Sequence, residues 1–227
     1  DFLHRCFTYH GDKSFKKCIE GNHTVIKLFA GVPGSGKSLA MQDFVRALNR
    51  SEGKYGCVII DRTSDWGLVD KDGIENIRWR GDPPHISMLS LDEDEGSIRE
   101  TLTEARDKGT TVVFQTPNAA EVGTWVRRVG DLVYCDDEID LTAPYIGWRE
   151  NPLRAFVHTG RHLPDETGYP REVHILGACR RVQNIHTDLT SMADEVFLFR
   201  SQGKHTIKRI VDEGWANDDD LDYITTM

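Results

Sequence analysis

The stretch GVPGSGKS, residues 31–38, matches the pattern G-x-x-x-x-G-K-[ST]. Its glycines permit backbone conformations with positive φ and leave room for an anion to approach the main-chain N–H groups. The motif therefore predicts a loop that surrounds a phosphate group. The residues expected to line it are Gly31, Val32, Pro33, Gly34, Ser35, Gly36, Lys37, Ser38 and Leu39.

Two side chains of this loop are expected to act directly on a bound nucleotide. Lys37 would place its ammonium group against the β- and γ-phosphates, and Ser38 would offer its hydroxyl to Mg²⁺. No N-K-x-D-like sequence, which would read guanine, occurs in the chain. We therefore expect ATP with Mg²⁺ rather than GTP.

The flanks of the loop favour the same interpretation. TVIKLFA, residues 24–30, is typical of a buried strand, and residues 38–50 carry apolar side chains at helical spacing. Farther along, strands are predicted at 55–61, 74–79, 110–116, 131–135, 172–178, 195–200 and 205–210, the last two joined as a hairpin by SQGK. Helices are predicted at 94–109, capped by Ser97 and ended by Gly109, at 119–130, at 151–163, and near 185–193.

This alternation of strands and helices predicts an α/β fold, a three-layer αβα sandwich around a mainly parallel sheet. The chain has 227 residues, of which 38% are hydrophobic, enough for one substantial core. We expect an N-terminal segment at 1–22, a P-loop ATPase domain at 23–212 and an acidic C-terminal tail at 213–227.

The charge is unevenly distributed along the chain. The net charge is −9, yet residues 145–210 carry ten Lys or Arg against seven Asp or Glu. The acidic remainder is typical of a solvated surface, whereas the basic part could face phosphates. No segment has the length of a membrane span, and the five cysteines are typical of reduced thiols, so we expect a soluble intracellular protein.

The acidic run DDEID, residues 136–140, follows the apolar strand predicted at 131–135. Ligands bind at the carboxyl ends of parallel strands, and nucleotide hydrolysis needs one acid for Mg²⁺ and one for the attacking water. We prefer Asp137 as the Mg²⁺ ligand and Glu138 as the general base. The alternative register uses Asp136 and Asp137. An adjacent Asp-Glu pair of this kind disfavours a nucleotide kinase.

These motifs together resemble those of the FtsK/HerA superfamily of DNA-translocating P-loop ATPases. The P-loop, VIIDRTSDWG, DLVYCDDEID, FVHTGRHL and ILGACRRVQNIHTDLTSMADEVFLFR fall in the order seen in that superfamily and cover residues 23 to 210. The short chain is most similar to viral and phage genome-packaging ATPases and to Zot-like assembly proteins. The resemblance implies an ASCE-type, RecA-like fold. Arg180 stands where the superfamily has a polar sensor Gln.

The resemblance also implies partners and a location. We expect a pentameric or hexameric ring that moves double-stranded DNA and that docks on a capsid, portal or membrane-vertex protein. Its place would be the cytoplasm of an infected cell, the virion, or both. The alternatives are a Zot-like assembly or export ATPase, a nucleotide kinase, and a P-loop protein that serves only as an interaction module.

Two further sets of residues carry open hypotheses. Arg161, at a predicted helix end, could reach a neighbour's γ-phosphate as an arginine finger or could simply cap its helix. Arg180 and Arg181 are the other finger candidates. Cys6, His10, Cys18 and His23 are zinc-ligand types, but the gap between the two pairs matches no standard finger, so we expect no zinc.

Overall fold

A predominantly parallel sheet runs through the computed structural model, which describes residues 7–9, 25–50, 55–63, 66, 86–144, 147–159 and 163–226. Within these residues eight strands pair in the order β1-β10-β2-β9-β6-β3-β5-β4. Only β1 runs antiparallel to its neighbour, β10. The strands are β1 Phe7–Tyr9, β2 Ile26–Ala30, β3 Gly56–Ile60, β4 Ile86–Leu89, β5 Thr111–Phe114, β6 Leu132–Asp136, β9 Val173–Cys179 and β10 Glu195–Leu198.

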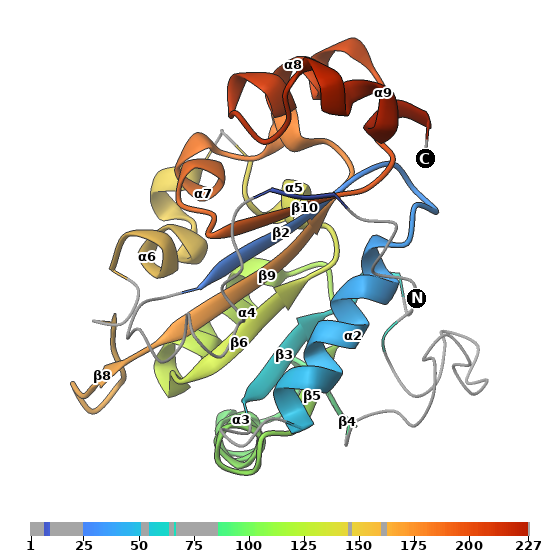
Figure 1. Cartoon of the computed structure of the whole chain (residues 1–227). Coiled ribbons are helices and arrows are strands. Elements are labelled where there is room, and N and C mark those ends of the chain that lie inside the picture. Colours follow the sequence, from blue (N-terminus) through green and yellow to red (C-terminus); the bar gives the residue numbers. More distant parts are fainter. Residues whose placement is uncertain are drawn as a thin grey trace.

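Helices cover both faces of this sheet (Figure 1). They are α2 Lys37–Arg50, α3 Glu95–Lys108, α4 Ala119–Val129, α5 Ile139–Thr142, α6 Pro152–Thr159, α7 Thr187–Ser191, α8 Lys204–Asp212 and α9 Asp218–Thr226. Two short 3₁₀ helices, η2 Trp148–Glu150 and η4 Val182–Asn184, and a small antiparallel pair, β7 Leu163–Pro164 with β8 Pro170–Arg171, complete the described elements.

The core has two parts because successive strand residues point to opposite faces. In β2, Phe29 packs with Met41 and Val45 of α2, while Leu28 belongs to the cluster that includes Val122 of α4 and Phe156 of α6. The predicted three-layer α/β architecture with a mainly parallel sheet is confirmed.

The central strands agree with the sequence prediction to within two residues at each end. Every residue of β2, β3, β5, β6 and β9 is buried. Strands covered on both faces read as continuous apolar runs, which explains why the sequence showed them so clearly. β9 lies between β2 and β6, so the strand that precedes the P-loop and the strand that ends in the acidic run are not direct neighbours.

The strand predicted at 205–210 and its hairpin are wrong, because the chain forms helix α8 there. The two buried residues of this helix, Thr206 and Ile210, are four positions apart and so share one helical face. Ion pairs at the same spacing join Lys208 to Asp212 on the exposed side and Arg209 to Glu213, which are largely buried and both contact Thr190.

Two helix ends also differ from the prediction. Asp94, not Ser97, caps α3: its carboxylate accepts from the N–H of Ser97 at 3.0 Å, while Gly109 ends the helix in the left-handed conformation as predicted. The helix predicted at 151–163 ends at Thr159, and β7 follows at 163.

The edge strand β4 was not predicted, because it has only four residues, ISML, and the second and third are exposed, so apolar and polar residues do not alternate as in a half-buried strand. The strand predicted at 74–79 lies outside the described residues, as do Cys6, His10, Cys18, His23 and Arg161.

The C-terminal segment contributes to the core. Trp215, Ala216 and Ile224 belong to the same apolar cluster as Ile210, although the segment also carries the acidic run that the sequence analysis set apart as a tail. In the part of the chain that the structure describes, no helix combines the length and apolar character of a membrane span.

Candidate active site

The loop between β2 and α2 is held from both sides at the carboxyl edge of the sheet. Gly31 donates its N–H to the carbonyl of Cys179 at 3.2 Å, and Val32 donates to that of Arg200 at 2.8 Å. A Cβ on Gly31 would lie 2.7 Å from Cβ of Phe199, so only glycine fits there. The loop is thereby pinned to the ends of β9 and β10.

The crest of the loop adopts the conformations that its glycines permit. Gly34 has φ 75° and Gly36 has φ 100°. α2 begins directly afterwards, at Lys37, and the first N–H groups of a helix have no acceptor within it. Such groups, aligned with the helix dipole, bind anions.

Lys37 and Ser35 lie inside this loop. Lys37 is 6% exposed and donates from Nζ to the carbonyl of Val32 at 3.0 Å. Burial lowers the pKa of Lys37. The Ser35 hydroxyl is buried and has no partner among the described residues. An ammonium group and a hydroxyl without a described partner, next to the N–H groups at the start of α2, fit an anion with several oxygens, as a phosphate has.

Asp137 faces this loop from the end of β6. The Ser38 hydroxyl donates to its carboxylate, with Oγ 2.9 and 2.8 Å from the two oxygens. The indole Nε1 of Trp66 donates to the same carboxylate at 3.2 Å. Burial raises the pKa of Asp137 to about 6, although these two hydrogen bonds oppose the shift. The structure thus brings together Ser38 and Asp137, the two residues predicted to hold Mg²⁺.

Asp136 points away from the loop into a buried cluster. Arg62 contacts both of its carboxylate oxygens, one of them at 3.2 Å from Nη2, and the Thr142 hydroxyl donates to it. The backbone N–H of Glu138 also donates to Asp136, at 3.0 Å. Asp136 is completely buried. The alternative register would need this saturated carboxylate to leave its partners, so the geometry favours Asp137 with Glu138.

Glu138 forms an ion pair with Arg180, which follows the neighbouring strand β9. The side chain of Glu138 is 14% exposed and that of Arg180 is 49% exposed. The close approach depends on Gly177, because a Cβ there would lie 2.5 Å from Cδ1 of Ile139, the first residue of α5. The backbone N–H of Arg180 also donates to Asp140 at 3.4 Å. Two residues predicted to act in catalysis therefore contact each other.

Sequence reasoning missed the residues that hold the acidic run in place. Arg62, Trp66 and Thr142 contact Asp136 or Asp137, and Asp61 accepts from the backbone N–H of Trp66 at 3.0 Å. The available signal was the polar sequence DRTSDW directly after a buried strand, since β3 and β6 are parallel neighbours. Residues at the carboxyl ends of such strands meet at one edge of the sheet.

No protein-family model and no curated protein matches this chain. Solved structures do. The genome packaging NTPase B204 from Sulfolobus turreted icosahedral virus 2 in complex with ATP-gammaS superposes with a TM-score of 0.62 at 15% identity, over 90% of this chain and 87% of that one. The chain has the fold of a P-loop packaging NTPase. The fold implied by the sequence resemblance is therefore confirmed.

Two further structures show the same likeness. The complex of that NTPase with AMPPCP has a TM-score of 0.62 at 15% identity and covers 90% of this chain and 88% of that one. B204, the DNA-packaging ATPase from Sulfolobus Turreted Icosahedral Virus, has a TM-score of 0.59 at 16% identity and covers 89% and 87%. The shared architecture thus extends over nearly the whole length of both chains.

Proposed function

We propose that this protein binds ATP with Mg²⁺, hydrolyses it, and uses the energy to move double-stranded DNA into a viral capsid. The contact of Ser38 with Asp137 at the mouth of the phosphate loop carries the proposal. Ser38 and Asp137 would hold Mg²⁺, which neutralises charge on the phosphate oxygens. The fold shared with viral packaging NTPases, some solved with ATP analogues, supports the same assignment.

The remaining groups have distinct roles in this proposal. Lys37, which now donates to a carbonyl of its own loop, turns its ammonium group to the phosphates. Glu138 orients and deprotonates the attacking water, which requires its carboxylate to leave Arg180. Arg180, half exposed at the end of β9, then becomes free to contact the γ-phosphate, the position for which the resemblance implies a sensor.

The assembly in this proposal is a ring of five or six subunits. DNA lies in its channel, and a capsid, portal or membrane-vertex protein holds the ring at the site of packaging. Arg161 of one subunit reaches the nucleotide of its neighbour. These parts rest on the sequence resemblance and on the basic excess of residues 145–210. The protein would work in the cytoplasm of the infected cell and at the virion.

The proposed function is tested by measuring ATP hydrolysis with and without duplex DNA, on protein sized by light scattering. A motor should hydrolyse ATP as a ring and do so faster with DNA. Lys37→Ala, which removes the ammonium group expected to contact the ATP phosphates, is the inactive control. A Zot-like export ATPase would hydrolyse without stimulation by DNA, a kinase would need an acceptor nucleotide, and an interaction module would not turn over.

A mixing experiment tests the role of Arg161. Arg161→Ala and Glu138→Gln should each be inactive while binding ATP, because an arginine finger contributes a factor of ~10³ or more. Mixed rings contain interfaces with an intact Glu138 and a neighbour's intact Arg161, so activity should partly return. If exchange of subunits is demonstrated and activity stays absent, Arg161 acts within its own chain or only caps its helix, and Arg180 or Arg181 becomes the better candidate for the finger.

A further inference from the structure

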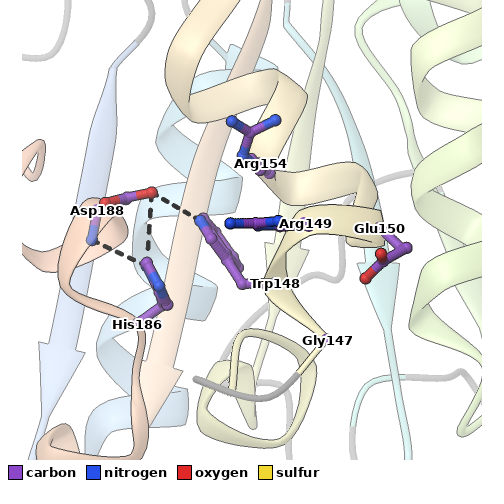
Figure 2. A pocket seen from close by; sticks show the side chains of 7 residues that line it. All are labelled: Gly147, Trp148, Arg149, Glu150, Arg154, His186 and Asp188. Carbon is purple, nitrogen blue, oxygen red and sulfur yellow. Dashed lines mark hydrogen bonds and ion pairs between the residues drawn. The ribbon is translucent and has the colours of Figure 1, made fainter.

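A pocket separate from the phosphate loop opens between η2, α6 and the start of α7. Its volume is about 430 Å³, and its lining is Gly147, Trp148, Arg149, Glu150, Arg154, His186 and Asp188. Figure 2 shows these side chains, with Arg149 and Arg154 on the same side of the pocket as the Trp148 indole. The volume is in the range of ligand sites.

The floor of the pocket is a fixed polar cluster. The Trp148 indole stacks on the His186 ring with centroids 4.7 Å apart, and its Nε1 donates to Asp188 at 2.7 Å. Nε2 of His158 lies 2.9 Å from the same carboxylate oxygen. Burial by itself would raise the pKa of Asp188, but these hydrogen bonds lower it. The carboxylate is therefore ionised and fully engaged.

The two arginines, in contrast, are unpaired. Arg149 and Arg154 are exposed, and neither guanidinium has a hydrogen bond or ion pair within the ranges that the structure describes. The lining also holds two carboxylates, Asp188, which is engaged by Trp148 and His158, and Glu150, which lies apart from Asp188 and Arg154 in Figure 2. The pocket thus presents two uncommitted guanidinium groups beside a rigid aromatic wall.

The position of the pocket ties it to the candidate active site. Its η2 side follows α5, which begins directly after Glu138, and its His186 side follows η4, which begins just after Arg180. The two sides are bonded together, since the N–H of His186 donates to the carbonyl of Ala143 at 2.9 Å and Pro144 pairs with Ile185. Both segments therefore lead from the pocket to the Glu138–Arg180 ion pair.

We propose that this pocket binds a phosphate of the double-stranded DNA backbone through Arg149 and Arg154. Planar guanidinium groups match the oxygens of a phosphate, and the Trp148 Nε1 already donates to Asp188 and so is not available to a base. The site is thus indifferent to DNA sequence. The inference rests on the proposed function. It places DNA where the segment that follows Glu138 contacts the segment that follows Arg180.

Binding to a fluorescently labelled duplex, measured by anisotropy at several salt concentrations, tests the site. Arg149→Ala/Arg154→Ala should weaken binding ~10-fold or more and should reduce the slope of log affinity against log salt by about 1 to 2. Arg127→Ala, which removes an exposed arginine of α4, is the matched control and should change neither quantity. Glu150→Gln should strengthen binding severalfold, since it removes one of the two negative charges of the lining.

ATP hydrolysis separates this site from the nucleotide site. The double variant should keep its rate without DNA and lose most of the stimulation by DNA. Wild-type affinity and salt slope in the double variant, with Glu150→Gln also unchanged, would overturn the proposal while leaving the proposed function intact. If the wild-type protein itself binds no DNA, the proposed function fails as well.

Other sources of phosphate, and a protein partner, are distinguished in the same experiments. If the pocket held a free anion, the double variant would bind inorganic phosphate or a fluorescent ATP analogue more weakly than the wild type does. A smaller assembly by light scattering, with unchanged DNA affinity, would identify the pocket as a contact between subunits. Either result would overturn the assignment to DNA.

Discussion

The carboxylates of Asp136 and Asp137 are adjacent in the chain but have opposite surroundings. Asp136 is completely buried and is neutralised by Arg62, with further donors from Thr142 and Glu138. Among the described residues, the hydrogen-bond donors to Asp137 are the neutral groups of Ser38 and Trp66. The nearby Lys37 ammonium lowers the pKa of Asp137, but burial outweighs it, and a divalent cation would supply further positive charge to this buried carboxylate. One carboxylate thus stabilises the fold, whereas the other is prepared for a ligand.

Removing the Asp136 carboxylate is expected to have the largest effect, and this effect is on the stability of the fold. Asp136→Ala should lower the free energy of unfolding by about 3–5 kcal/mol, because it leaves Arg62 buried without its partner. Urea denaturation measures the loss. The control is Asp43→Ala: this carboxylate is 46% exposed where it pairs with Arg46, so its loss should matter by less than about 1 kcal/mol. Equal stability of the two variants would show that the Arg62–Asp136 pair does not support the fold.

The next effect is on hydrolysis. Glu138→Gln should bind ATP normally and hydrolyse it at least ~100-fold more slowly, because the amide cannot accept the proton of the attacking water. Single-turnover hydrolysis and binding of a fluorescent ATP analogue measure the two steps. Normal hydrolysis in Glu138→Gln together with inactive Asp137→Asn would instead assign the pair to Asp136 and Asp137.

Asp137→Asn should stabilise the nucleotide-free protein at neutral pH. Because the pKa of Asp137 is raised from 3.8 to about 6, the folded chain binds its proton more tightly than the unfolded chain. The stability of the wild type therefore falls as the pH rises from about 4 to about 6, while the amide does not titrate. The variant should gain on the order of 3 kcal/mol above pH 6 and nothing below pH 4. Melting curves measured from pH 4 to pH 6 test this prediction. A stability difference between the variant and the wild type that does not change with pH would contradict it.

The smallest effect concerns the indole that holds Asp137. Trp66→Phe keeps most of the buried volume but removes the donor to the carboxylate, a contribution of about 1 kcal/mol. The Mg²⁺ concentration for half-maximal hydrolysis should rise a few-fold, and the rate at saturating Mg²⁺ should stay close to wild type. A lower saturating rate with unchanged Mg²⁺ dependence would show that Trp66 acts on another step.

The different surroundings of Asp136 and Asp137 also show how far the sequence could predict the site. The phosphate loop, its strand and its helix are contiguous, so spacing alone located Lys37 and Ser38. Which carboxylate meets Ser38 could not be decided from DDEID, because it depends on which face of β6 each residue takes. Arg62 and Trp66 lie more than seventy positions from the carboxylates that they contact, and only the pairing of β3 with β6 brings them there.

Local periodicity also failed at α8, where HTIKRI is compatible with both a strand and a helix. Burial decided the outcome, since Thr206 and Ile210 face the core from one side of a helix. The contacts of Trp148 in η2 with His186 and Asp188 at the start of α7 likewise could not be predicted from the sequence pattern.

The sequence by itself determined the α/β class, the order of the buried strands, and the phosphate loop, because these features follow from local spacing and from apolar runs that must be buried. Only the tertiary structure decided the partner of each carboxylate, the Glu138–Arg180 ion pair, and the pocket beside Arg149 and Arg154. Each of these joins residues from different strand ends, and their contacts exist only once the parallel sheet places those ends along one edge.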